Sequence, residues 1–174
     1  MTPLLPSLQA LDSLGGIDGL CLWVRVDERP LRGLASFVDW RLCGYLSQLL
    51  KTSFFCGEPE EALLLAGGGC IPCRRIFVWG LGGAKEWTRE SVEQHIEKTQ
   101  KKLRLAGVSS LAMSTPEGVF EEFWQKACER HFSWVSTFVL FRPMSCLKGT
   151  SGTSTTTATE VGAGAGALAR KRYC

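Results

Sequence analysis

Short apolar runs alternate with amphipathic helical patterns between Gly19 and Phe141. Residues 19–26 alternate in the manner of a strand. Between Leu34 and Leu50, apolar residues recur every three or four positions, as in a helix that buries one stripe. Further strands are predicted at 61–67, 74–80, 109–114 and 134–141, and further helices at 88–106 and 116–128. This order predicts an α/β fold in which a mixed central sheet carries helices on both faces.

The length and composition predict a single folded domain. A chain of 174 residues with 45% hydrophobic content can build one sizeable core, but it is short for two domains of typical size. We expect a flexible leader at residues 1–18, the domain at 19–144 and a disordered tail at 145–174. The tail is rich in Gly, Ser, Thr and Ala, so it cannot bury enough apolar surface to offset its ordering entropy.

The charge pattern and the cysteines bear on location. No basic residue precedes Arg25, so the amino terminus lacks the features of a signal peptide. No run reaches the roughly 20 apolar residues that span a bilayer. The eight cysteines are scattered, as expected of small buried side chains in a reducing compartment. We therefore expect a cytoplasmic protein without a membrane partner.

The charge balance bears on nucleic-acid binding. The 20 basic and 17 acidic residues nearly cancel, which argues against a dedicated nucleic-acid binder.

Three glycines follow a predicted strand and precede a helix start. Gly80, Gly82 and Gly83 therefore offer an arrangement in which backbone amides can hold a phosphate. The third glycine of the dinucleotide fingerprint would fall at Lys85, and no Gly-Lys-Ser/Thr motif follows. An ordinary tight turn is the favoured interpretation, with nucleotide binding as the alternative.

Cys70 and Cys73 have the spacing of a zinc half-site or a redox couple. No second pair stands at zinc-finger spacing, and a strand rather than a helix is predicted after them, where a redox cysteine would need a helix start. They are weak metal candidates only. His95 and His131 belong to no catalytic motif. We therefore expect no metal, no cofactor and no catalytic residue.

A basic group lies in the second half of the predicted helix at 88–106. Lys98, Lys101, Lys102 and Arg104 would suit nucleic acid, but Glu97 stands four residues before Lys101, as on ordinary solvated helices. No interleaved aromatic residues are present for base stacking. A solvated face is the favoured interpretation, and nucleic-acid binding, helped by the basic tail, is the alternative.

The segment VRVDERPLRGLASFVDWR first resembles an active-site loop because it is rich in charge. Asp27 and Glu28 stand just before a predicted helix, where the helix dipole favours acids, and Arg32 could pair with either. The segment is therefore interpreted as a strand-to-helix junction. Surface recognition by Asp27, Glu28, Arg29 and Arg32 is its remaining functional possibility.

Two long stretches resemble the N-terminal domain of leucine aminopeptidases (cytosol aminopeptidases). They are RRIFVWGLGGAKEWTRESVEQHIEKTQKKLRLAGVSSLAM and DERPLRGLASFVDWRLCGYLSQLLKTSFFCGEPEEALLL, and the resemblance covers about Gly19 to Phe141. It implies a macro-domain-like three-layer sandwich. In that family the metal ions, the catalytic lysine and arginine and the motif NTDAEGRL belong to a separate C-terminal domain. The motif is not in this sequence, so no catalytic residue is carried over and no enzymatic activity is expected.

The resemblance also implies a role. In complete enzymes of the family, this domain helps hexamer assembly and shapes access to the active site, and in some bacterial members it contributes to DNA binding. We therefore expect a non-catalytic interaction or regulatory module that mediates protein–protein assembly, by self-association or with a partner such as a full-length aminopeptidase. The alternatives are nucleic-acid binding through Lys98–Arg104 and ADP-ribose or nucleotide binding at Gly80–Gly83.

Overall fold

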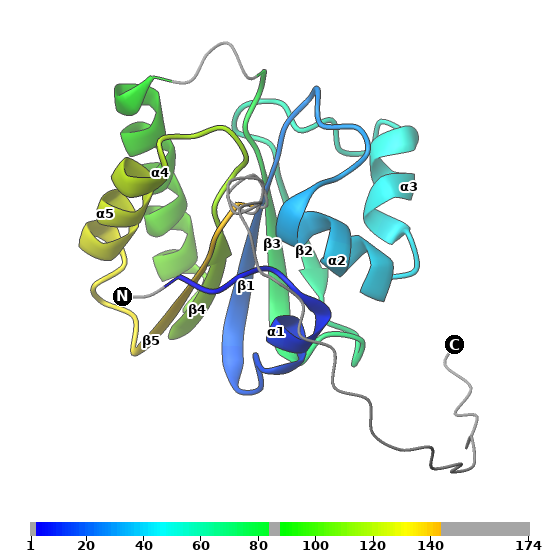
Figure 1. Ribbon diagram of the computed structural model, residues 1–174, viewed down its shortest axis with the longest axis horizontal. Helices are drawn as coiled ribbons and strands as arrows, with labels where there is room; N and C mark the ends of the chain where they lie inside the picture. Colours follow the sequence, from blue (N-terminus) through cyan, green and yellow to red (C-terminus); the bar gives the residue numbers. More distant parts are fainter. Residues whose placement is uncertain (1–2, 84–87, 144–174) are drawn as a thin grey trace, which may run out of the picture.

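The computed structural model of the chain describes residues 3–83 and 88–143. Its centre is a five-stranded sheet with the strand order β2-β3-β1-β4-β5, and helices cover both of its faces (Figure 1). The helices are α1 (Leu8–Asp12), α2 (Gly33–Arg41), α3 (Tyr45–Lys51), α4 (Arg89–Leu105) and α5 (Glu121–His131). The strands are β1 (Ile17–Val24), β2 (Ala62–Ala66), β3 (Cys73–Gly80), β4 (Ser110–Ser114) and β5 (Thr137–Phe141).

The sheet is mixed, as the sequence predicted. Strand β1 is parallel to β3 and β4, and β4 is parallel to β5, because helices carry the chain back between these strands. Strand β2 is antiparallel to β3, since only a short turn joins the two. The turn contains Gly67, where a Cβ would lie 2.1 Å from the carbonyl oxygen of Cys73. Glycine is therefore required for the close approach of the two strands.

Two cores lie on opposite faces of the sheet. One contains side chains of α1, α2 and α3, and the other contains side chains of α4 and α5. Strand β1 contributes Leu20 and Leu22 to the first core and Cys21 and Trp23 to the second. The predicted three-layer sandwich, with a mixed central sheet and helices on both faces, is thus confirmed. The nearly continuous apolar run of β1 follows from its burial on both faces.

The flexible leader expected at residues 1–18 is wrong for the described part of that segment. Ser7 caps α1 by accepting a hydrogen bond from the backbone N–H of Ala10, and Leu11 and Leu14 are buried in the first core. The N–H of Leu4 donates to the Leu140 carbonyl at 2.8 Å. The leucines of this segment add to a core that the later helices only partly cover, which explains why it is ordered.

The helix predicted from Leu34 to Leu50 is two helices. Cys43 and Gly44 have positive φ angles of 55° and 81°, and Gly44 is the residue type that accepts this conformation most readily. The apolar repeat continues across the break because both helices face the same core, so the periodicity alone did not reveal it. Cys43, expected within the helix, lies exposed at the corner.

The remaining elements follow the predictions with small shifts. Thr88 caps α4 as predicted, accepting a hydrogen bond from the Ser91 N–H at 3.1 Å. Helix α5 begins at Glu121 rather than at Pro116, so Val119 and Phe120 precede it. The tail predicted at 145–174 lies outside the described residues. None of the helices in the described ranges is long and apolar enough to cross a membrane.

Candidate functional site

The topology indicates that a ligand site would lie at one end of the sheet, where the carboxyl ends of the parallel strands meet. The carboxyl ends of the parallel strands β1, β3, β4 and β5 lie at the same end of the sheet. In open α/β sheets, ligands bind outside the carboxyl ends of neighbouring strands whose connections leave over opposite faces. Here the chain after β1 runs to α2 on one face, and the chain after β4 runs to α5 on the other. A crevice is therefore expected between residues 25–32 and 115–120.

Arg25 occupies this position. Its guanidinium group donates from Nη2 to the carbonyl oxygen of Glu117. The same nitrogen lies 3.5 Å from the point where a Cβ on Gly118 would stand, and Gly118 has a φ of 72° that favours glycine. An arginine side chain that is partly buried thus bridges the two loops. The Arg25 side chain therefore lies at the position where the topology predicts a ligand crevice.

The glycine turn after β3 is also committed to internal contacts. The N–H groups of Gly80, Leu81 and Gly82 donate to the carbonyl oxygens of Glu61 (2.9 Å), Val24 (3.0 Å) and Gly57 (2.8 Å), respectively. Backbone amides that already donate to protein carbonyls are not available to a phosphate. These contacts support the interpretation as a structural turn.

Gly80 is needed for packing rather than for a ligand. A Cβ at Gly80 would lie 2.0 Å from the carbonyl oxygen of Glu58, whereas a Cβ at Gly83 would meet nothing within 4 Å. The loop before β2 therefore presses directly on the end of β3. The Glu61 carboxylate holds that loop by accepting hydrogen bonds from three successive backbone N–H groups, those of Cys56, Gly57 and Glu58.

The charged segment after β1 is largely a junction, as predicted, but its pairing differs from the expectation. Glu28 accepts a hydrogen bond from the backbone N–H of Arg32 at 2.9 Å, and the expected side-chain pair is not formed among the described contacts. Burial raises the pKa of Glu28. Arg29 donates to the carbonyl oxygens of Arg25 and Glu28, and also to that of Cys56. Asp27 and Arg32 are exposed and stay candidates for recognition.

The two cysteines of the CxxC spacing have different environments. Cys70 is exposed in the β2–β3 turn, and Cys73 is buried in β3. Burial raises the pKa of the Cys73 thiol to about 11, which disfavours the reactive thiolate. In residues 3–83 and 88–143, no group of three or more His, Cys, Asp or Glu side chains could hold a metal ion.

The basic residues of α4 are each engaged locally. Lys98 pairs with Glu60, and Lys101 pairs with Glu97 at 2.8 Å. The Lys102 ammonium group lies 5.1 Å from the centre of the Trp79 ring. These contacts form a mixed-charge face of the kind that ordinary solvated helices carry.

Sequence reasoning missed one charged cluster between α4 and α5. His131 Nε2 lies 2.6 Å from the Glu93 carboxylate, which also binds the Arg130 guanidinium at 2.6 and 2.7 Å. No carboxylate partner had been identified for this histidine. Glu93 and His131 are 38 residues apart, so no local spacing could reveal the contact. The cluster ties the two helices together.

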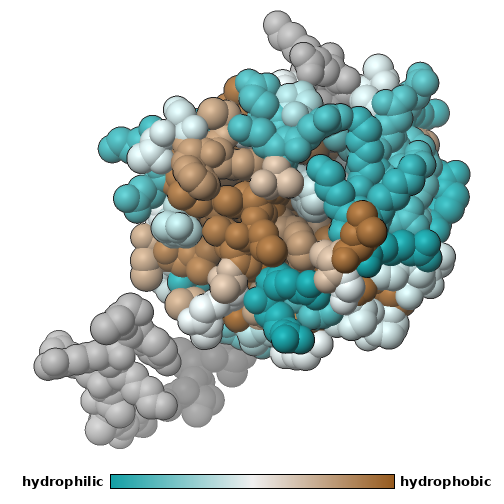
Figure 2. Space-filling model, turned by 180° about the vertical axis from the view of Figure 1, so that it is seen from behind, coloured by the Kyte–Doolittle hydropathy of each residue, from teal (hydrophilic) through white to brown (hydrophobic). Residues whose placement is uncertain are grey.

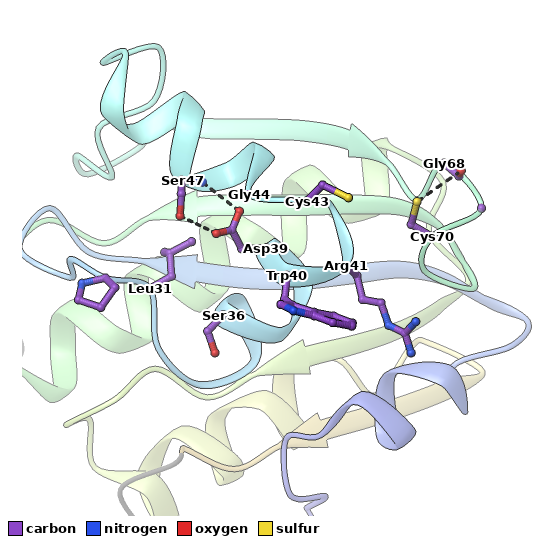
Figure 3. Close-up of a pocket in the computed structure, with 12 residues that line it drawn as sticks. Leu31, Ser36, Asp39, Trp40, Arg41, Cys43, Gly44, Ser47, Gly68 and Cys70 are labelled. Atoms are coloured by element: carbon purple, nitrogen blue, oxygen red, sulfur yellow. Dashed lines mark hydrogen bonds between the residues drawn. The ribbon is translucent and has the colours of Figure 1, made fainter. Parts of the chain in front are cut away.

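A groove on the outer side of α2 and α3 is the largest of the cavities described, at about 1130 Å³. It runs from Leu31 past the α2–α3 corner to the β2–β3 turn (Figure 3). Asp39 shapes its wall by accepting a hydrogen bond from the N–H of Ser47 at 3.0 Å. Trp40 is 66% exposed at this groove.

Trp40 is held beside a charged neighbour. The Arg41 guanidinium lies 5.7 Å from the centre of the Trp40 ring and pairs with Asp12 of α1 at 2.6 Å. The groove therefore combines an exposed aromatic ring with an oriented cation. No periodicity could reveal this combination, because α1, which supplies Asp12, was expected to be a flexible leader.

The sequence and fold were compared with known proteins. Residues 22–129 match the cytosol aminopeptidase family, N-terminal domain. A probable cytosol aminopeptidase of Alkaliphilus metalliredigens is 23% identical over 103 residues, which cover 59% of this chain and 20% of that protein. The chain thus spans about a fifth of the length of this curated relative. These matches confirm the resemblance seen in the sequence.

Solved structures agree in fold. A tomato leucine aminopeptidase mutant superimposes with a TM-score of 0.54 at 14% identity, covering 72% of this chain and 29% of that chain. The Trypanosoma brucei macrodomain, solved in complex with ADP-ribose, gives a TM-score of 0.54 at 13% identity, covering 81% of this chain and 62% of that chain. At these identities the likeness concerns the fold alone.

Replacing Gly80 should destabilise the folded protein even when no ligand is present, because the role we assign to this glycine is in packing. We expect Gly80→Ala to lower the free energy of unfolding by about 1 to 3 kcal/mol, since the new methyl group overlaps the backbone at Glu58. Urea denaturation would measure the change. Gly83→Ala is the matched control and should stay within about 0.5 kcal/mol of the parent. Equal stability of the two variants would contradict this packing role.

The cysteines should differ in reactivity. At pH 8 we expect iodoacetamide to alkylate Cys70 at least about 50 times faster than Cys73, because Cys73 is buried and its pKa is about 11. Mass spectrometry of peptides after timed quenching would give both rates. In guanidinium chloride the two rates should converge. Comparable rates in the folded protein would contradict the burial of Cys73 and its raised pKa.

Proposed function

Because the chain belongs to the cytosol aminopeptidase family through its N-terminal domain, we propose that this domain is a non-catalytic interaction module that mediates protein–protein assembly in the cytoplasm. The part matched in the family is not its metal-binding part. The described residues bring no three potential metal ligands together. The side chains on which we base the proposal lie instead on the surface, where a partner protein could contact them.

The exposed Trp40 carries this proposal. Tryptophan and arginine are enriched among the side chains that dominate binding energy at interfaces, and here Trp40 and Arg41 lie together beside a large groove. The Asp12 carboxylate holds the Arg41 guanidinium in place, so binding would cost this side chain little conformational entropy. A partner that covers the ring would gain about 2 kcal/mol or more from it.

We expect Trp40→Ala to weaken association roughly 30-fold, equivalent to about 2 kcal/mol. Sedimentation velocity would measure self-association, and titration with a purified full-length cytosol aminopeptidase would measure binding to that partner. The melting temperature should hardly change, because Trp40 is mostly exposed. Leu105→Ala is the control, since Leu105 is 89% exposed on α4 and lies outside the groove.

Two results would contradict the proposal. One is a finding that the Trp40→Ala and Leu105→Ala variants associate equally strongly. The other is metal-dependent hydrolysis of a leucyl-anilide by the purified chain, lost on chelation and regained on adding metal, which would show a catalytic role.

ADP-ribose binding is the alternative that the macrodomain fold brings, because a Trypanosoma brucei macrodomain of the same fold was solved with this ligand. The contacts of this chain give it less support. Arg25 links the loops after β1 and β4 through a hydrogen bond, and the amides of the glycine turn donate to carbonyl oxygens. Nucleic-acid binding likewise has less support, because acidic partners accompany Lys98 and Lys101 on the basic face.

We expect 1 mM ADP-ribose to shift the melting temperature by less than about 1 °C, because Arg25 and the glycine-turn amides are engaged within the chain. A ligand that did bind the folded state would stabilise it and raise the melting temperature. Differential scanning fluorimetry would measure the shift. The Trypanosoma brucei macrodomain is a positive control. A concentration-dependent rise of several degrees would show that the folded chain binds ADP-ribose and would favour this alternative.

A further inference from the structure

Strand β2 forms one edge of the sheet and pairs only with β3 among the described residues. The Glu61 carbonyl accepts from the Gly80 N–H, and the Gly67 N–H donates to the Arg74 carbonyl, so odd-numbered residues point their polar backbone groups toward β3. Because these groups alternate along a strand, the N–H and C=O groups of Ala62, Leu64 and Ala66 point outward. This edge can accept another strand.

The five residues of β2 lack the features that usually prevent an edge strand from pairing with another chain. Natural edge strands carry charges, prolines or bulges that prevent pairing with another chain, whereas β2 reads Ala-Leu-Leu-Leu-Ala and keeps an unbroken register with β3. Leu64 is 59% exposed. Figure 2 shows a hydrophobic patch on the side of the molecule where β2 lies in the reversed view of Figure 1.

We propose that β2 pairs in antiparallel fashion with β2 of a second copy of this chain, around a two-fold axis at Leu64. This inference rests on the proposed assembly function, names a second copy of the chain as a partner and adds a contact separate from the Trp40 groove. A two-fold interface needs a surface that is complementary to itself, and the sequence of β2 reads the same in both directions about Leu64. This register opposes Ala62 to Ala66 and Leu64 to its own copy, so every outward backbone group of β2 gains a partner.

The charges at the two ends of the strand favour the antiparallel arrangement. Glu58 is exposed before the start of β2, and Arg74 is exposed beside its end. Antiparallel pairing brings the acidic end of one copy near the basic end of the other, whereas parallel pairing would bring like charges together. Such complementarity selects the orientation of partners.

The apolar face gains a cover in the same arrangement. Leu64 stands opposite Phe77 of β3, whose side chain belongs to the core under α4 and α5, but Leu64 is not buried there. Leu64 of the second copy would lie directly across the axis and cover it. Leu63 and Leu65, partly buried on the opposite face, would meet their counterparts in the same way.

Disulfide trapping tests the register. The outward-facing pair at the axis should have a Cα separation of about 5.5 Å, within the range that a disulfide bridges. We expect full-length Leu64→Cys, with Cys43, Cys56, Cys70, Cys146 and Cys174 replaced by Ser, to become mostly a covalent dimer on mild oxidation. Leu105→Cys in the same background is the control and should stay monomeric. An equal mixture of Ala62→Cys and Ala66→Cys proteins should also cross-link, as the register requires.

Sedimentation of Leu64→Lys provides a second measurement. A lysine on the axis opposes its own copy, so the dimer dissociation constant should rise at least about 10-fold, with an unchanged melting temperature because the position is exposed. Failure of Leu64→Cys to cross-link above the Leu105→Cys level, with assembly still sensitive to Trp40→Ala, would overturn the β2 contact alone. Loss of both effects would overturn the proposed function as well.

Discussion

Strand β1 pairs with β3 on one side and with β4 on the other, and its side chains enter two separate cores. Trp23 of β1 packs edge-on against Trp124 of α5, with ring centres 5.1 Å apart. Burial of such large rings supplies much of the stabilisation available to a domain of this size. The same central position makes the carboxyl end of β1 the natural place for a ligand crevice.

At that position the described residues make contacts with one another. The Arg25 side chain reaches the loop after β4, and the loop before β2 rests on Gly80 so closely that no side chain fits between them. Contacts within the chain thus join the described loops at this end of the sheet. The groove beside Trp40 and the outward backbone groups of β2 are the surfaces on which the two proposals rest.

The periodicity of the sequence predicted most of the helices and strands. It predicted their boundaries and their tertiary contacts less well. The Thr88 cap was predicted because it is encoded within four residues. The break at Gly44 was missed because the apolar repeat continues through it. The leader was misjudged because burial of Leu11 and Leu14 depends on helices formed later in the chain. The Trp40 groove was missed because one of its supports, Asp12, comes from that same leader.

By itself, the sequence determined the α/β class, the order of the elements and the family resemblance, because periodicity and local motifs are written in neighbouring residues. Only the tertiary structure decided which surfaces are open. Whether the glycine turn can hold a phosphate depends on carbonyl groups of Val24, Gly57 and Glu61, which are distant in the chain. Whether β2 lies inside the sheet or at its edge depends on where the other strands pair. Such facts arise from long-range packing, which no local pattern records.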